Sequence, residues 1–193
     1  MVVSLSPELK KSYTAEQYLA LEVDSDIRSE FRDGEIVEMT GRTPDHNRLS
    51  SALNALLWLS LRKQPYSVFV TNQRLWIPAA NLYTYPDVMV IADPVGLQPG
   101  RKDNPILIAE TLSTSTEGYD RGDKFAHYRT IETFQEYVLI NQYQPRVEHY
   151  VKKGEHQWLF TEYSGLETSF KLSAVLVEIA LADLYEAVEF KTT

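Results

Sequence analysis

The amino-acid sequence predicts an α/β or α+β fold in which a mixed central β-sheet is flanked by helices. One long segment, 44–63, repeats apolar residues at three- and four-residue steps, which is typical of an amphipathic helix. Helical periodicity returns at 118–129. Between these segments, runs rich in Val, Ile, Leu and aromatic residues indicate four strands, at 66–70, 73–77, 87–92 and 106–112. This order is typical of helices that pack on a sheet.

Local signals predict the remaining elements. Thr14 and Gln17 have the spacing of a capping box, so we expect a short helix that ends near Glu22. The dipeptide Asp33-Gly34 lies between two extended runs and favours a two-residue hairpin turn. The runs EYVLIN, RVEHYV and WLFTEY indicate further strands, the last two forming a hairpin. The C-terminal stretch 174–188 is expected to form a closing helix.

Composition limits the class of protein. With 193 residues, of which 44% are hydrophobic, the chain is expected to form one domain over residues 1–193. The absence of cysteine excludes disulfides, a thiolate zinc site and a cysteine nucleophile. The most apolar stretch, 52–61, is too short to cross a bilayer, and the N-terminus has no secretory signal pattern. A soluble, cytoplasmic protein is therefore expected.

The net charge of −8 argues against tight binding to nucleic acid, because phosphate contacts usually require a basic protein. A cleft that gathers carboxylates around a metal ion is itself acidic until the cation binds. The charge therefore weighs against strong DNA binding more than against phosphodiester chemistry.

Two carboxylates are candidates for one site. Asp87 follows Pro86 at the start of a strand, and Glu110 interrupts the apolar run of the next strongly apolar strand. Two such carboxylates on paired strands suit a hard divalent cation such as Mg²⁺. Alternatively, Asp87 caps a backbone amide, and Glu110 faces solvent or pairs with an arginine.

A lysine follows at helical spacing. Asp120, Lys124 and Tyr128 are four residues apart and share one helical face. A lysine near the reacting phosphate can orient water or stabilise developing negative charge. The plainer reading is an Asp–Lys pair on a solvated helix.

The ordered series of motifs resembles the Uma-two family, which is described as restriction endonuclease-like and belongs to the PD-(D/E)XK superfamily. The series is SEFRDGEIVEMTGRTPDH, PDVMVIADP, PILIAETLSTST, the Asp120, Lys124, Tyr128 pattern and EYVLIN, and it covers the chain from about Thr14 to Asn141. The resemblance implies a restriction endonuclease-like core.

The resemblance also implies roles for particular residues. Asp87 and Glu110 would bind Mg²⁺ or Mn²⁺, with the main-chain carbonyl of Thr111 and the carboxylate of Glu30 as further ligands. The lysine that the superfamily often carries two residues after the glutamate is replaced here by Leu112, so Lys124 would have to project into the same space. Candidate residues for substrate contact or support of the site are His46, Asp120, Tyr128, Ser113 and Ser115.

The expected function is therefore metal-dependent endonuclease activity on nucleic acid, with DNA as the substrate and a homodimer as the working form. Two alternatives stay open. The chain could be a catalytically silent protein that keeps the nuclease scaffold as a binding or assembly module. It could also be a carboxylate-pair hydrolase acting on a glycoside, which would leave the lysine without a role.

Overall fold

The computed structural model describes residues 12–39, 41–92 and 104–190. Its central feature is a six-stranded sheet with the order β10-β9-β8-β7-β6-β3. Strands β7 and β8 run parallel, and the other neighbours are antiparallel, so the sheet is mixed as the sequence predicts. The bounds are β3 Tyr66–Val70, β6 Val88–Ala92, β7 Pro105–Leu112, β8 Glu136–Asn141, β9 Arg146–Gly154 and β10 Gln157–Ser164.

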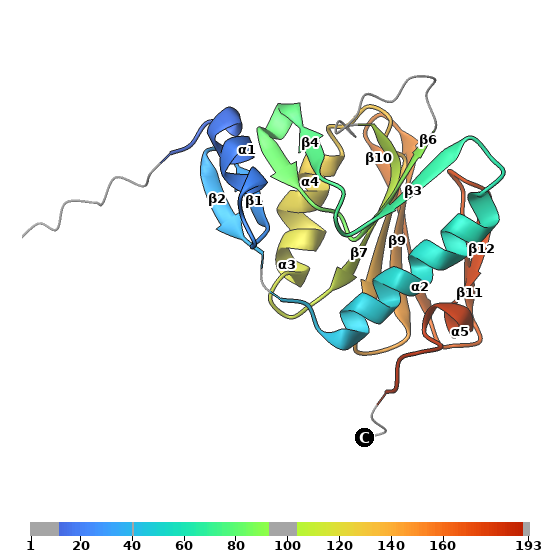
Figure 1. Ribbon diagram of the computed structural model, residues 1–193. Helices are drawn as coiled ribbons and strands as arrows, with labels where there is room; N and C mark the ends of the chain where they lie inside the picture. The colour runs from blue at the N-terminus through green and yellow to red at the C-terminus, as the bar shows by residue number, and fades with distance from the viewer. Residues whose placement is uncertain (1–11, 40, 93–103, 191–193) are drawn as a thin grey trace, which may run out of the picture.

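Helix α2 (Pro44–Leu61) covers one face of this sheet (Figure 1). Leu49, Leu53 and Leu57 of the helix are buried against this face, where they pack on alternate residues of the strands. Those strand residues include Val88, Val90, Leu107, Ala109, Val138 and Ile140. Thr43 caps the helix N-terminus by accepting a hydrogen bond from the backbone amide of His46.

The helical segment predicted at 118–129 covers the other face. It consists of α3 (Glu117–Tyr119), one π-helical turn, η2 (Asp120–Lys124), and α4 (Phe125–Tyr128). Phe125 and Tyr128 pack there with Ile108, Leu112 and other residues of the second apolar cluster. Because side chains alternate across a strand, Glu110 shares this face with Ile108 and Leu112.

A smaller antiparallel sheet, of order β2-β1-β5-β4, lies beside the central one. Its strands are β1 Ser29–Arg32, β2 Glu35–Glu38, β4 Leu75–Ile77 and β5 Leu82–Thr84, and a single 3-10 turn, η1 Pro78–Ala80, joins the last two. Asp33 and Gly34 have φ values of 44° and 95°, which confirms the predicted hairpin turn. Helix α1 (Ala15–Val23) has the expected capping box at Thr14.

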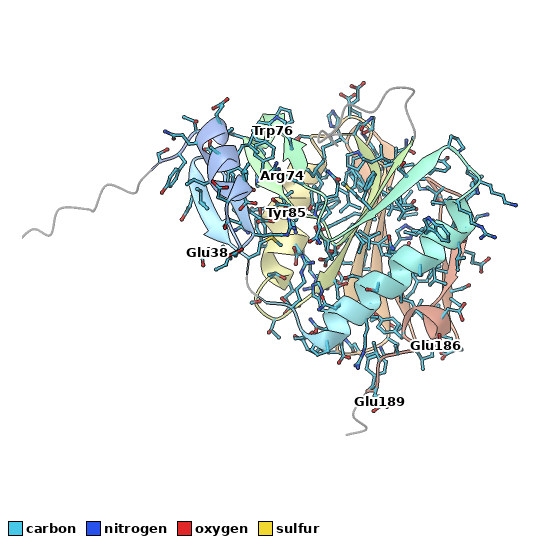
Figure 2. All side chains as sticks on the ribbon, viewed as in Figure 1. Glu38, Arg74, Trp76, Tyr85, Glu186 and Glu189 are labelled. Atoms are coloured by element: carbon cyan, nitrogen blue, oxygen red, sulfur yellow. The ribbon has the colours of Figure 1, made fainter. Side chains whose placement is uncertain are left out.

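Aromatic and cationic side chains pack around the smaller sheet, and Figure 2 labels Arg74, Trp76 and Tyr85 in this region. The ring of Trp76 lies 4.2 Å from that of Tyr83, centroid to centroid. The guanidinium carbon of Arg74 lies 5.4 Å from the same ring. This packing fixes β1, which carries Glu30.

The predicted closing helix at 174–188 is wrong for most of its length. Residues Val177–Ala180 form strand β12, which pairs with β11 (Ser169–Leu172), and only Leu181–Leu184 forms a helix, α5. From Val175 to Ile179 buried and exposed residues alternate, so the period is that of a strand. All three buried positions, Val175, Val177 and Ile179, are β-branched, which favours the strand further.

Among the described residues, no helix is long and apolar enough to cross a membrane. The expectation that the chain has no secretory signal depends on its N-terminal segment. Most of that segment, residues 1–11, lies outside the described residues.

Candidate active site

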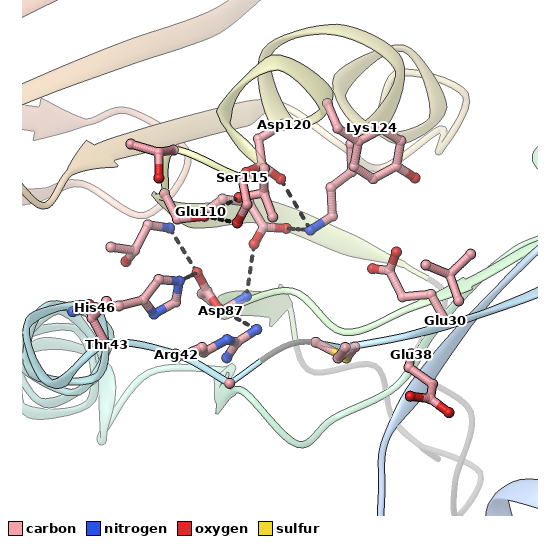
Figure 3. Close-up of a pocket in the computed structure, with 18 of the residues that line it drawn as sticks. Glu30, Glu38, Arg42, Thr43, His46, Asp87, Glu110, Ser115, Asp120 and Lys124 are labelled. Atoms are coloured by element: carbon pink, nitrogen blue, oxygen red, sulfur yellow. Dashed lines mark hydrogen bonds and ion pairs between the residues drawn. The ribbon is translucent and has the colours of Figure 1, made fainter.

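Neighbouring strands bring the two candidate carboxylates together. In the β6–β7 pair Val88 lies opposite Ala109, so Asp87 comes next to Glu110. The backbone amide of Asp87 donates to Glu110 Oε2 at 3.3 Å, and the amide of Thr111 donates to Asp87 Oδ2 at 2.8 Å (Figure 3). Asp87 and Glu110 are only 2% and 3% exposed. The backbone therefore holds both carboxylates at one position on the edge of a buried sheet.

Lys124 reaches the same position from the π-helical turn. Its Nζ lies 2.8 Å from Glu110 Oε1 and 3.4 Å from Asp120 Oδ1, and the residue is 6% exposed. The hydroxyl of Tyr128 donates to the same Glu110 oxygen at 2.6 Å. Lys124 is thus buried against the carboxylates, so the alternative of a solvated Asp–Lys pair does not describe it.

Glu30 faces Lys124 from β1, across the cavity (Figure 3). It is 4% exposed, accepts a hydrogen bond from the hydroxyl of Thr84, and accepts another from Arg32 Nε at 2.9 Å. The guanidinium of Arg32 also lies over the ring of Tyr119, 4.0 Å from its centroid. Glu30 is therefore a buried member of the site and not a solvated strand residue.

Two further residues bind Asp87 from the N-terminal end of α2. His46, a candidate from the sequence, places Nε2 3.2 Å from Asp87 Oδ2. Arg42, which was not among the sequence candidates, places Nη2 2.7 Å from Asp87 Oδ1. No local pattern marks Arg42, because it lies between elements and its partner is far away in the sequence.

The remaining candidates have different surroundings. The side chain of Thr111 points towards α2, where its hydroxyl lies 3.1 Å from that of Ser50. Ser113 and Ser115 line the cavity and lie within hydrogen-bonding distance of each other, at 3.1 Å. Tyr119 was missed by sequence reasoning, and its buried hydroxyl has no hydrogen-bond partner among the described residues.

These side chains line a cavity of about 390 Å³. Its carboxylates come from Glu30, Glu38, Asp87, Glu110 and Asp120, and its permanent cations from Arg32, Arg42 and Lys124. Five acids and three fixed cations therefore line one cavity that is open to solvent. An arrangement of this kind favours the binding of a further cation.

The pKa values follow from burial and from these pairs. Burial raises the pKa of Glu110 to about 8, with the charges of Asp87 and Asp120 adding to the effect and Lys124 opposing it. Burial also works against the charge of Lys124, but Glu110, Asp120 and Glu30 outweigh it and raise the pKa of the ammonium well above its usual value. For Asp87, burial is outweighed by His46, Arg42 and Lys124, which lower the pKa.

The donor set fits a hard divalent cation by its chemistry. Asp87 and Glu110 supply carboxylate oxygens, and Asp87 Oδ1 receives no well-directed hydrogen bond although Arg42 lies close to it. Within the described ranges, no three acids or histidines are already arranged around one point as a preformed cage. Mg²⁺ does not require one, since it commonly binds one or two carboxylates and keeps several waters.

Comparisons of the sequence match this chain to a protein family and to two proteins of Synechocystis. The sequence model of the Uma2 family, described as "Putative restriction endonuclease", matches residues 15–183. "Uncharacterized protein sll1609" of Synechocystis sp. (strain ATCC 27184 / PCC 6803 / Kazusa) is 45% identical over 166 residues, 84% of this chain and 94% of that protein. "Uncharacterized protein slr1290" of the same organism is 29% identical over 180 residues, 91% of this chain and 92% of its own.

A solved structure shares the fold. It is the crystal structure of a "putative nuclease belonging to DUF820" from Anabaena variabilis ATCC 29413, with a TM-score of 0.74 at 16% identity. The match covers 90% of this chain and 98% of the other. It confirms the predicted fold class, a mixed sheet flanked by helices with a restriction endonuclease-like core.

Proposed function

The chain belongs to the Uma2 family, and from this premise we propose that it is a metal-dependent endonuclease of the PD-(D/E)XK type that hydrolyses phosphodiester bonds of DNA. One observation carries the proposal. Asp87, Glu110 and Lys124, which come from three different elements, meet in one cavity, with the lysine Nζ 2.8 Å from Glu110 Oε1. Two acids and a buried amine around one point suit phosphoryl transfer better than they suit a structural salt bridge, because the acids stay in contact with a cavity.

The proposed ligands of Mg²⁺ or Mn²⁺ are the carboxylates of Asp87 and Glu110, the main-chain carbonyl of Thr111 and the carboxylate of Glu30. A bound divalent cation would supply Lewis-acid polarisation of the phosphate and a more acidic water. The protein contributes a rigid arrangement, because the amide of Thr111 fixes Asp87 and the hydroxyl of Tyr128 fixes Glu110.

Lys124 contributes positive charge where the reacting phosphate gains negative charge. Its ammonium is held by Glu110 and Asp120, so it does not have to reorganise during the reaction. Its raised pKa keeps the amine of Lys124 protonated at neutral pH. This suits electrostatic stabilisation of the phosphate and does not suit a general base.

The experiment is cleavage of supercoiled plasmid DNA with Mg²⁺, Mn²⁺ or EDTA. We expect nicking that needs the cation and falls by about a hundredfold or more in Asp87→Asn and Lys124→Met. Asp183→Asn and Lys153→Met are matched controls at exposed positions and should cleave as the wild type does. A wild type that leaves double-stranded DNA, single-stranded DNA and RNA intact with both metals would remove the proposal.

Homodimerisation is part of the proposal, because two copies are a common way to cut both strands of a duplex. Sedimentation velocity with and without a DNA duplex measures it. A monomer in both conditions would contradict the dimer without affecting the chemistry of a single nick.

A second function, a catalytically silent binding module, is favoured by the pairing inside the site. Asp87 already contacts Arg42 and His46. Glu110 already contacts Lys124 and Tyr128. Both acids therefore have partners in the protein without an added ion. Thermal unfolding with millimolar Mg²⁺ or Mn²⁺ separates the two functions, since a cation that binds the native state raises Tm. An unchanged Tm with either ion favours the silent module.

A further inference from the structure

Both carboxylate oxygens of Asp87 already have partners from the protein. Oδ2 accepts from the Thr111 amide at 2.8 Å and lies 3.2 Å from His46 Nε2. Oδ1 lies 2.7 Å from Arg42 Nη2. The proposed ligand of the cation is therefore occupied by a permanent positive charge, and a metal ion can reach it only by replacing one of these partners.

Arg42 is the partner that can be replaced. The Thr111 amide is part of strand β7, and the His46 ring is nearly buried in the first turn of α2. Arg42 instead lies between β2 and α2, with its side chain 21% exposed. Its contact is electrostatic, since Oδ1 receives no well-directed hydrogen bond. The neighbouring residue, Gly41, is also loosely packed, because a Cβ atom added there would meet no heavy atom within 4 Å.

The other fixed cations of the cavity each have a second partner that the metal ion would not take. Arg32 would stay over the ring of Tyr119 even if Glu30 turns to a metal ion. Lys124 retains Asp120 even if Glu110 turns to a metal ion. In the part of the chain that the structure describes, Arg42 is paired with Asp87 alone. Arg42 is thus the fixed cation that would be left with no partner among these residues and become free for an anion.

We propose that Arg42 takes the place of the divalent cation on Asp87 in the metal-free protein, and that the cation displaces it to bind a backbone phosphate of the nucleic acid. A guanidinium suits this second position because its planar donors match phosphate oxygens. The exchange also limits repulsion between the acids before a cation arrives. This inference rests on the proposed function, because it takes Asp87 as a metal ligand and nucleic acid as the substrate.

The first test measures Mn²⁺ affinity by titration calorimetry on the full chain. Arg42→Met removes the charge but keeps most of the side-chain length, and we expect it to bind Mn²⁺ at least about tenfold more tightly than the wild type. Arg42→Lys, which keeps the charge, should return the affinity towards that of the wild type. Arg48→Met removes an exposed arginine of α2 that pairs with Asp45 and should leave the affinity unchanged. Equal or weaker Mn²⁺ binding by Arg42→Met would overturn the inference.

The second test measures binding of a labelled DNA duplex by fluorescence anisotropy, in EDTA and with Ca²⁺. The released guanidinium should matter only when a cation is bound, so Arg42→Met should lose about fivefold in DNA affinity with Ca²⁺ and less than about twofold in EDTA. An equal loss in both conditions would contradict the release. Arg42→Gln is the second variant if Arg42→Met does not fold.

The two proposals fail separately. Tighter Mn²⁺ binding by Arg42→Met in a chain that cleaves no nucleic acid would keep Arg42 as the stand-in for the cation and remove the nuclease. Cleavage by the wild type with unchanged Mn²⁺ affinity in Arg42→Met would keep the nuclease and remove the role of Arg42.

Discussion

Glu110 places a carboxyl group in the most apolar strand of the sheet, where all eight residues of β7 are buried. Burial raises its pKa to about 8, and Lys124 compensates only part of that cost. Such a residue weakens the metal-free fold when it is ionised. A cost of this kind is common at functional sites, where stability is given up for a reactive arrangement.

This cost predicts the pH dependence of stability. A carboxyl group whose pKa rises on folding stabilises the native state fully below its unfolded pKa near 4.5, and this contribution is lost as the pH rises through about 8. Glu110→Gln cannot titrate. Between about pH 5 and pH 8.5, the free energy of unfolding of the wild type should therefore fall by about 4 kcal/mol relative to that of the variant.

Urea denaturation in EDTA at several pH values measures this difference. Glu178→Gln, on the exposed face of β12, is the matched control and should follow the wild type at every pH. Parallel curves for the wild type and Glu110→Gln would show that burial does not raise the pKa of Glu110.

Among single residues, the sequence predicted those site residues that a local pattern makes conspicuous. Glu110 interrupts an apolar run, and Lys124 shares a helical face with Asp120 and Tyr128, so both stand out in the sequence. Arg42 and Tyr119 do not. Their place in the cavity depends on how the segment before α2 and the start of the helical segment pack, and this is decided by tertiary contacts that no local period records.

At the scale of elements, the π-helical turn Asp120–Lys124 sets how the lysine enters the site. Inserted turns of this type often occur at functional sites. Gly122 lies in the middle of the turn, where a more flexible backbone tolerates the wider coil. The helix was predicted from its spacing, but its π-helical turn was not, because a single wide turn hardly changes the apolar pattern.

The first and last parts of the chain illustrate when such predictions succeed. The capping box at Thr14, the Asp33-Gly34 turn and the apolar stripe of α2 are local signals, and all three are present in the structure. The C-terminal region carries competing signals, because a run of apolar and acidic residues suits either a helix or a strand. Pairing with β11 decides the outcome there.

Glu136 attaches this C-terminal hairpin to the central sheet. At the start of β8 it is fully buried, lies 2.8 Å from His149 Nε2, and accepts backbone hydrogen bonds from Ser173 at 2.7 Å and Ala174 at 2.9 Å. We expect Glu136→Ala to lower the free energy of unfolding by about 3 to 5 kcal/mol, because the buried ring of His149 and two partly buried backbone amides lose their acceptor.

Urea denaturation at neutral pH checks this value. Glu178→Ala removes an exposed glutamate of the same hairpin, which is bonded to the hydroxyl of Ser169, and should cost less than about 1 kcal/mol. A loss below about 1 kcal/mol in Glu136→Ala would mean that the hairpin is held by its apolar contacts alone.

At the scale of the whole molecule, the net charge of −8 must be reconciled with the proposed substrate, which is a polyanion. The exposed surface cannot supply the broad attraction on which most DNA-binding proteins depend. The fixed cations that line the cavity are Arg32, Arg42 and Lys124. Contact with DNA should therefore be confined to a few phosphates near the site and should need the divalent cation, which offsets the acids there.

This argument predicts a weak salt dependence. Each neutralised phosphate contributes about −0.9 to the slope of log affinity against log salt, so three cations give a slope of about −3. Anisotropy titrations of a labelled duplex between about 50 and 200 mM NaCl measure this slope. Ca²⁺ replaces Mg²⁺ so that the DNA stays intact, and gel electrophoresis checks that it does.

In EDTA the affinity for DNA should fall, because the five acids of the cavity then repel the phosphates. A slope steeper than about −6 would place most phosphate contacts on a surface outside the cavity, and equal binding in EDTA would separate DNA binding from the metal.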